Sequence, residues 1–150
     1  MCGIVGYADV RPVAHDDGAR ALKRMCDAIV HRGPDDSGIH QDAGVGLGMR
    51  RLSIIDLAGG HQPMQTADGR YTIVYNGETY NFKELRRELE GKGVRFRTQG
   101  DSEVVLNAFA EGGEASLPRL CGIFGFAVYD KQEGAVLLCR DPLGVKPLYY

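Results

Sequence analysis

Cys2 directly follows the initiator methionine, so removal of Met1 would place a thiol and a free α-amine on one residue. An α-amino group has a pKa of about 7.7–8.0 and can act as the general base for its own side chain. N-terminal amines activate threonine nucleophiles in this way, and a thiol is easier to activate than a hydroxyl. Taken alone, a cysteine at position two is more often accidental than catalytic.

Asn76 and Gly77 follow an apolar run, residues 72–75, and allow two interpretations. An Asn-Gly pair is typical of a hairpin turn, although a helical pattern rather than a second strand follows here. Alternatively, the side-chain amide and the glycine N–H converge on a developing oxyanion, because glycine has no Cβ to obstruct the approach. Without other evidence, the pair favours the turn.

Three charged residues, Arg51, Glu78 and Asp101, could bind the two ends of an amino acid. Taken singly, each is best interpreted as a solvated surface charge, and Asp101 or Ser102 could cap a helix that begins near Glu103. A forked guanidinium suits a carboxylate, and two carboxylates suit an ammonium group. Together the three would hold the α-carboxylate and the α-ammonium of a free amino acid.

The composition is that of an ordinary folded domain: 150 residues, 43% hydrophobic and 25% charged. Eighteen basic and twenty acidic residues give a net charge of −2, which provides no electrostatic case for nucleic acid or an anionic membrane. The chain has no apolar stretch long enough to span a bilayer and no signal peptide. We therefore expect a cytoplasmic protein.

The cysteines and histidines do not follow the spacing of a zinc site, so a metal centre is not expected. Without a secretory signal, a disulfide framework is not expected either. Cys26 lies on the apolar face of a helical pattern, and Cys121 and Cys139 lie in strand-like runs. All three are interpreted as small core residues.

The hydrophobic pattern predicts strands over residues 3–8, 37–41, 45–55, 70–75, 123–129 and 135–139. Helices are predicted over 18–30, from Asn81 to about Leu89, and over 103–111, with Asn81 and Glu84 forming a capping box. Gly46 and Gly48 alternate along a strand and indicate close packing. Helices between groups of antiparallel strands predict an α+β fold. The last residues, 145–150, form a strand-like apolar run, from which we expect a fragment of a longer protein.

Six motifs occur in order along the chain, and from the first to the last they span residues 1–144. They are Met1-Cys2-Gly3-Ile4-Val5-Gly6, His31-Arg32-Gly33-Pro34-Asp35, Arg51-Leu52-Ser53-Ile54-Ile55-Asp56, Tyr75-Asn76-Gly77-Glu78, Gly100-Asp101-Ser102-Glu103-Val104 and Arg140-Asp141-Pro142-Leu143-Gly144. With these motifs the chain resembles the glutaminase domain of class II glutamine amidotransferases, in the branch of the asparagine synthetases. Ser102 departs from the threonine or cysteine that this branch often carries.

The resemblance implies an N-terminal-nucleophile hydrolase fold, in which two antiparallel sheets lie between helix layers as a four-layer αββα sandwich. It implies that residues 1–150 are the glutaminase domain and that a C-terminal ATP-dependent synthetase domain is absent from this chain. The Ser-Gly-Gly-x-Asp-Ser pyrophosphate-binding motif of that domain does not occur here. No cofactor is expected in this domain, whereas ATP and Mg²⁺ are expected for the synthetase domain.

The resemblance also assigns roles to the candidate residues. Cys2 would attack the side-chain amide of glutamine, with Asn76 and Gly77 stabilising the oxyanion. The implied glutamine-binding residues are Arg51, Leu52, Ile54, Ile55, Asn76, Gly77, Glu78 and Asp101. In this set Arg51 would hold the α-carboxylate, Glu78 and Asp101 the α-ammonium, and Leu52 to Ile55 would line the pocket with backbone atoms.

The implied reaction converts L-glutamine to glutamate and ammonia, and the full-length protein would use the ammonia for ATP-dependent amidation of aspartate to asparagine. The expected partners are L-glutamine and the synthetase domain of the same protein, with homodimer formation left open. Three alternatives remain: an asparagine synthetase-like protein that amidates another carboxylate, a non-catalytic glutamine-binding module, and a peptide amidase on the same fold.

Overall fold

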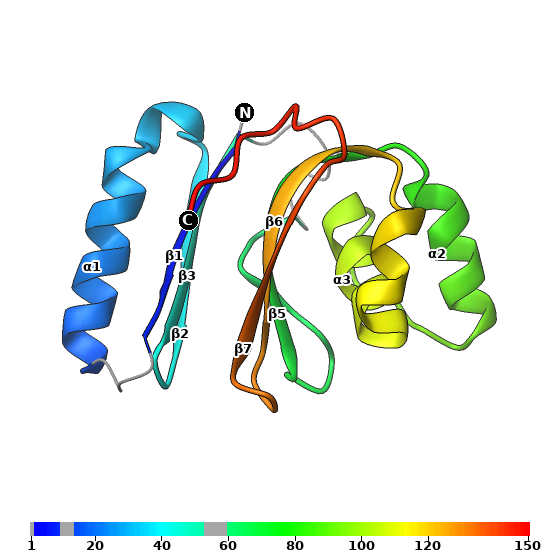
Figure 1. Cartoon of the computed structure of the whole chain (residues 1–150), viewed down its shortest axis with the longest axis horizontal. Helices are drawn as coiled ribbons and strands as arrows, with labels where there is room; N and C mark the ends of the chain where they lie inside the picture. The colour runs from blue at the N-terminus through cyan, green and yellow to red at the C-terminus, as the bar shows by residue number, and fades with distance from the viewer. Residues whose placement is uncertain (1, 10–13, 53–59) are drawn as a thin grey trace.

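The computed structural model describes residues 2–9, 14–52 and 60–150. A first antiparallel sheet contains β1 (Gly3–Ala8), β2 (Asp36–Asp42) and β3 (Val45–Arg51) in the order β1-β3-β2. Helix α1 (His15–Ala28) and the short 3₁₀ segment η1 (Val30–Arg32) connect β1 to β2. α1 lies along the outer face of this sheet (Figure 1).

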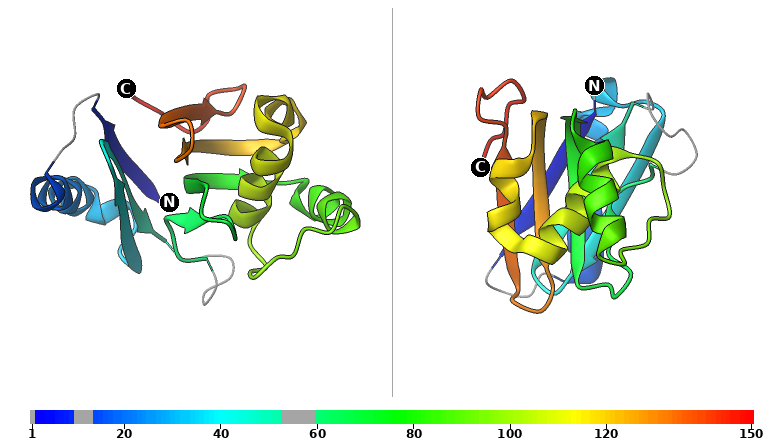
Figure 2. Two further views of the ribbon diagram at one scale, coloured as in Figure 1. Left: turned by 90° about the horizontal axis from the view of Figure 1, so that it is seen from below. Right: turned by 90° about the vertical axis from the view of Figure 1, so that its right-hand side faces the viewer.

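The second antiparallel sheet has the order β4-β5-β6-β7. Its strands are β4 (Met64–Gln65), β5 (Tyr71–Thr79), β6 (Gly122–Asp130) and β7 (Ala135–Arg140). Between β5 and β6 the chain forms α2 (Phe82–Gly91), α3 (Asp101–Gly112) and the 3₁₀ segment η2 (Gly113–Arg119). α2 and α3 cover the outer face of this sheet, so the layers follow the predicted αββα order (Figure 2).

Side-chain alternation along β5 builds the two cores. Val74 faces the first sheet and joins a cluster with Leu47 and Met49 of β3. Ile73 and Tyr75, its neighbours, face α2 and α3 and join the larger cluster there, because successive side chains of a strand point to opposite faces. The helices in the described ranges lack the length and apolar character needed to cross a bilayer.

The predicted close packing along β3 is confirmed. A Cβ at Gly46 would lie 2.6 Å from Cζ of Tyr7, and a Cβ at Gly48 would lie 2.8 Å from Sγ of Cys26. Side chains at these positions would push β1 or α1 away from β3. The glycines therefore let a helix and a neighbouring strand approach the centre of the first sheet.

The expected capping box of α2 is wrong. Asn81 occupies the N-cap position, but its side chain makes no capping hydrogen bond. Its Nδ2 donates to the carbonyl of Arg119 at 2.9 Å, and its Oδ1 accepts from the N–H of Cys121 at 3.0 Å. A tertiary link to the segment before β6 thus replaces the local cap. Cys121 itself is exposed, contrary to its interpretation as a core residue, because it precedes β6 rather than lying in it.

Two strand boundaries also differ from the sequence-based expectation. β3 ends at Arg51, and the rest of the run expected to extend it lies mainly in 53–59, outside the described residues. β5 continues through Asn76 and Gly77 to Thr79, so the turn interpretation of this pair is wrong. Residues 145–150 form no strand.

Candidate active site

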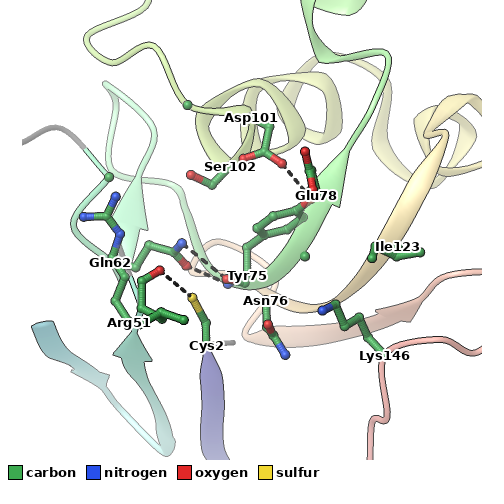
Figure 3. A pocket seen from close by; sticks show the side chains of 14 residues that line it. Cys2, Arg51, Gln62, Tyr75, Asn76, Glu78, Asp101, Ser102, Ile123 and Lys146 are labelled. Atoms are coloured by element: carbon green, nitrogen blue, oxygen red, sulfur yellow. Dashed lines mark hydrogen bonds between the residues drawn. The ribbon is translucent and has the colours of Figure 1, made fainter. Parts of the chain in front are cut away.

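A cavity of about 170 Å³ lies where the ends of β1, β3 and β5 meet the start of α3. Seven of the residues singled out from the sequence line it together: Cys2, Arg51, Leu52, Asn76, Gly77, Glu78 and Asp101 (Figure 3). They come from both sheets and from a helix. The remaining two residues of the predicted set, Ile54 and Ile55, lie outside the described residues.

The register of the first sheet brings Cys2 next to Arg51. β1 and β3 are antiparallel, and Gly3 is paired with Arg50, so Cys2 and Arg51 follow as neighbours at the end of the ladder. The half-buried Cys2 thiol donates a hydrogen bond to the carbonyl of Leu52, with 3.6 Å between Sγ and O. The thiol is therefore held at the cavity wall by the residue that follows β3.

Arg51 is only 7% exposed, and the chain packs against it from two sides. A Cβ at Gly60 would lie 2.6 Å from Cζ of Arg51, so the guanidinium rests directly on the Gly60 backbone. At the other side, the Arg51 carbonyl accepts from the N–H of Asp35 at 3.1 Å. A Cβ at Gly33 would lie 2.5 Å from the Arg51 nitrogen. The His31–Asp35 motif thus buttresses the cavity.

The pairing of β5 with β6 fixes the direction of the Gly77 N–H. Phe124 is the partner of Gly77, yet Phe124 directs both backbone groups toward Asp141. Its carbonyl accepts from the Asp141 N–H at 2.8 Å, and its N–H donates to Asp141 Oδ2 at 3.3 Å. In an antiparallel ladder such a pair is non-hydrogen-bonded. The N–H of Gly77 therefore points away from β6, toward the opposite edge of β5.

The neighbours of Gly77 on that edge are held by side chains. The N–H of Tyr75 donates to Gln62 Oε1 at 2.6 Å, and Gln62 Nε2 donates to the Tyr75 carbonyl at 3.3 Å. Two residues beyond Gly77, the N–H of Thr79 donates to Asp101 Oδ2 at 2.8 Å. Because β4 pairs only with Thr72 and Ile73, this part of the edge borders the cavity instead of another strand.

Asn76 alternates with Gly77 and presents its amide near Cys2 (Figure 3). The side chain is 7% exposed, and within the described ranges its amide makes no side-chain hydrogen bond. The structure adds a second reason for glycine at position 77. A Cβ there would lie 2.6 Å from Cα of Phe124, so the tight approach of β6 by itself excludes a side chain.

Asp101 is the first residue of α3, where the helix dipole favours a negative charge. Neither Asp101 nor Ser102 provides the expected side-chain cap, because Asp101 turns to β5. Its Oδ2 accepts from the hydroxyl of Tyr75 at 3.0 Å as well as from Thr79. Burial, and then the Asp101 charge, raise the pKa of Tyr75, so the phenol remains a neutral donor. Figure 3 shows Glu78 beside Asp101, with Arg51 across the cavity.

Several lining residues were missed by sequence reasoning: Gly60, Gln62, Tyr75, Gly100, Ser102, Ile123 and Lys146. Lys146 is 8% exposed, and a loop built on Asp141 positions it. The Asp141 carboxylate accepts from the N–H groups of Val145 and Lys146, both at 2.9 Å, while Arg140 Nε donates to the Lys146 carbonyl at 2.7 Å. The Arg140–Gly144 motif was a signal for this loop, but its chemistry did not indicate which side chain the loop would deliver.

Known proteins are similar to this chain over its whole length. The chain is 46% identical over 151 residues to asparagine synthetase [glutamine-hydrolyzing] 1 of Bacillus subtilis (strain 168), with 100% of this chain and 24% of the relative covered. It is 40% identical over 149 residues to asparagine synthetase B [glutamine-hydrolyzing] of Escherichia coli (strain K12), with 99% and 26% covered. The chain thus spans about a quarter of the length of these relatives.

A solved structure supports the fold independently of close sequence similarity. Glutamine phosphoribosylpyrophosphate amidotransferase from B. subtilis, in complex with ADP and GMP, matches with a TM-score of 0.72 at 18% identity. The match covers 97% of this chain and 38% of that chain. A family model described as a glutamine amidotransferase domain matches residues 1–150. The chain therefore belongs to the glutamine amidotransferase domain family.

Proposed function

We propose that this chain hydrolyses the side-chain amide of L-glutamine to glutamate and ammonia, with Cys2 as the nucleophile. The observation that carries the proposal is one cavity whose lining brings together a thiol, an arginine, two carboxylates and the Gly77 N–H at the edge of β5. The charged groups Arg51, Glu78 and Asp101 lie toward one end, and Cys2 lies with Asn76 toward the other (Figure 3). This arrangement matches a molecule with a zwitterionic head and an amide tail.

In the binding step Arg51 pairs with the substrate α-carboxylate, and Asp101 and Glu78 pair with the α-ammonium. A planar guanidinium forms two parallel hydrogen bonds with a carboxylate, which orients the substrate as well as binding it. The buried position of Arg51 and its contact with Gly60 limit the number of rotamers that it can adopt. The amide of the bound glutamine then extends toward Cys2.

In the chemical step the α-amine of Cys2, free after removal of Met1, takes the thiol proton, and the sulfur attacks the amide carbon. The oxyanion that forms accepts hydrogen bonds from the Asn76 amide and the Gly77 N–H. The ammonium group then returns its proton to the leaving nitrogen, and ammonia departs from a γ-glutamyl thioester. Water hydrolyses this thioester to glutamate and restores the thiol, so the reaction needs no cofactor.

The ammonia has a further use in a longer protein, as the length of the relatives suggests. We propose that a C-terminal synthetase domain, with ATP and Mg²⁺, uses it to amidate aspartate to asparagine. The relatives named above are asparagine synthetases about four times as long as this chain. The identity of the carboxylate that the full-length protein amidates remains a prediction. Formation of a homodimer also remains a prediction. Ammonia release by the domain itself does not depend on them.

The test is glutamate and ammonia release from L-glutamine by the chain, in the absence of ATP, after mass determination has shown that Met1 is removed. Cys2→Ala should abolish turnover. Cys121→Ala is the matched control, because Cys121 is exposed and does not line the cavity. Turnover by Cys2→Ala, or normal turnover by a sample that retains Met1, would refute the proposed mechanism.

A labelling experiment separates catalysis from simple binding. A glutamine analogue with an electrophilic group in place of its amide should modify Cys2 and no other cysteine. Burial raises the pKa of the Cys26 and Cys139 thiols, which lowers the fraction of the reactive thiolate at these two positions. Peptide mapping should locate the label, and an excess of L-glutamine should prevent it.

A further inference from the structure

We infer that Tyr75 is a positioning residue, which acts together with Thr79 to orient the Asp101 carboxylate toward the substrate α-ammonium and so selects for a free amino acid. The inference rests on the proposed glutamine hydrolysis and adds residues that do not themselves touch the substrate in that proposal. Its basis is a closed set of hydrogen bonds between β5 and the first residue of α3.

The hydrogen bonds connect three side chains and one backbone group. The Tyr75 hydroxyl lies 3.0 Å from Asp101 Oδ2 and 2.9 Å from Thr79 Oγ1, and the Thr79 N–H donates to the same Oδ2 at 2.8 Å. A phenol has one hydrogen, which Tyr75 gives to Asp101. The Thr79 hydroxyl therefore donates to Tyr75, and every donor of the set is directed, in turn, at the carboxylate.

The burial of the set shows that it is more than a surface contact. Tyr75 is 3% exposed and Thr79 is fully buried. The ring of Phe126 packs against that of Tyr75, with 6.0 Å between the two ring centroids. A phenylalanine would fill the same apolar site without a polar group that must be satisfied. Within the described residues, the hydrogen-bond partners of the Tyr75 hydroxyl are the Asp101 carboxylate and the Thr79 hydroxyl.

The hydrogen bonds leave one oxygen of Asp101 for a ligand. Oδ2 accepts both from Tyr75 and from Thr79, and in the described part of the chain Oδ1 has no hydrogen-bond partner. Asp101 lines the cavity, so a cation bound there meets a carboxylate that cannot rotate freely. Without the Tyr75 hydroxyl only the Thr79 N–H would hold Oδ2, and the carboxylate could turn away from the ammonium group.

The experiment compares two substrates that differ only in the group that Asp101 would bind: L-glutamine and 4-carbamoylbutanoate, its analogue without the α-amine. Tyr75→Phe should lower kcat/KM for glutamine about tenfold, chiefly through KM, as expected for the loss of one hydrogen bond to a charged group. The same variant should leave kcat/KM for the analogue unchanged. Thr79→Val should also lower kcat/KM for glutamine. Thr79→Ser, which keeps the hydroxyl, should have the wild-type kcat/KM.

Tyr129→Phe is the matched control, because Tyr129 is also 3% exposed but lies on β6, outside the cavity. Tyr129→Phe should leave kcat/KM unchanged for both substrates. An unchanged KM for glutamine in Tyr75→Phe would overturn the inference, as would an equal loss with both substrates, which indicates a purely structural role. Absence of glutamate release by the wild type would instead refute the proposed function. If Tyr75→Phe does not fold, Thr79→Val with the two substrates decides.

Discussion

Substitution of Asn76 by alanine gives the most direct test of how the cavity would lower the barrier to glutamine hydrolysis. The side chain is 7% exposed, and within the described ranges its amide makes no side-chain hydrogen bond that truncation would remove. The backbone of Asn76 pairs with Gly125 of β6, which the substitution leaves in place. Asn76→Ala therefore removes a donor from the cavity at little expense to the fold.

The expected magnitude follows from the position of the donor. Loss of one oxyanion donor lowers kcat by about 10²–10³, which corresponds to roughly 2.7–4 kcal/mol of transition-state stabilisation. KM should change little, because the hydrogen bond forms mainly as charge develops on the oxygen. The Gly77 N–H, directed to the cavity edge by the pairing of Phe124 with Asp141, remains and accounts for residual turnover.

The assay is the steady-state rate of glutamate release over a range of glutamine concentrations, with the melting temperature recorded for each variant. Asn107→Ala is the control, because Asn107 is an amide on α3 that bonds Glu103 and does not line the cavity. It should leave kcat and KM unchanged. A raised KM with unchanged kcat in Asn76→Ala would show that Asn76 grips the ground state, and the oxyanion assignment would be wrong.

Three further predictions use the same preparations. Arg51→Ala should raise KM about tenfold or more with a smaller change in kcat, because it binds a group that the reaction leaves unchanged; the same kinetic pattern as Asn76→Ala would contradict this division of roles. Gly60→Ala should raise KM, because its Cβ would lie 2.6 Å from Cζ of Arg51 and would displace the guanidinium; an unchanged KM would show that Gly60 does not position Arg51. Burial acts to raise the pKa of Asp141, but hydrogen bonds from the N–H groups of Lys146 and Val145 hold this pKa below its ordinary value. The ionised carboxylate therefore stabilises the fold above the unfolded pKa of about 3.9, and this stability is lost as the pH falls through the folded pKa. Asp141→Asn should therefore lower the free energy of unfolding by about 1.5–3 kcal/mol at pH 7 and by progressively less as the pH is lowered below about 3.9, as measured by denaturant titration, and a difference independent of pH would refute the argument.

The layered fold could be predicted because it depends on patterns that a sequence displays directly. Alternation along 70–75 identified a strand, and the predicted strand over 3–8 has the same bounds as β1. The site was predictable for a different reason: Cys2, Arg51, Asn76, Glu78 and Asp101 lie in ordered motifs of a known family. No local pattern indicated that they meet, since they come from two sheets and a helix.

The errors arise where a tertiary contact competes with a local preference. Asn81 has the residue type and spacing of a capping box, but it bonds the backbone before β6 instead. Gln62 lies in a segment that reads only as a polar loop, yet its amide pairs with the backbone of Tyr75. Glutamine has no local conformational preference that would predict a hydrogen bond to a distant strand. The partner of Gln62 could therefore be found only in the folded chain.

The edge of β5 that borders the cavity illustrates how, among the described residues, a sheet can leave one backbone N–H unpaired without offering a pairing edge to another polypeptide. Unpaired strand margins template intermolecular β-association, and proteins usually blunt them with charge, proline or a covering segment. Here the groups on either side of Gly77 are already occupied, at Tyr75 by Gln62 and at Thr79 by Asp101. An incoming strand would find the N–H and C=O of Gly77 and no continuing ladder. The arrangement thus leaves room for a small ligand, and it lacks the series of unpaired backbone groups that strand-to-strand aggregation needs.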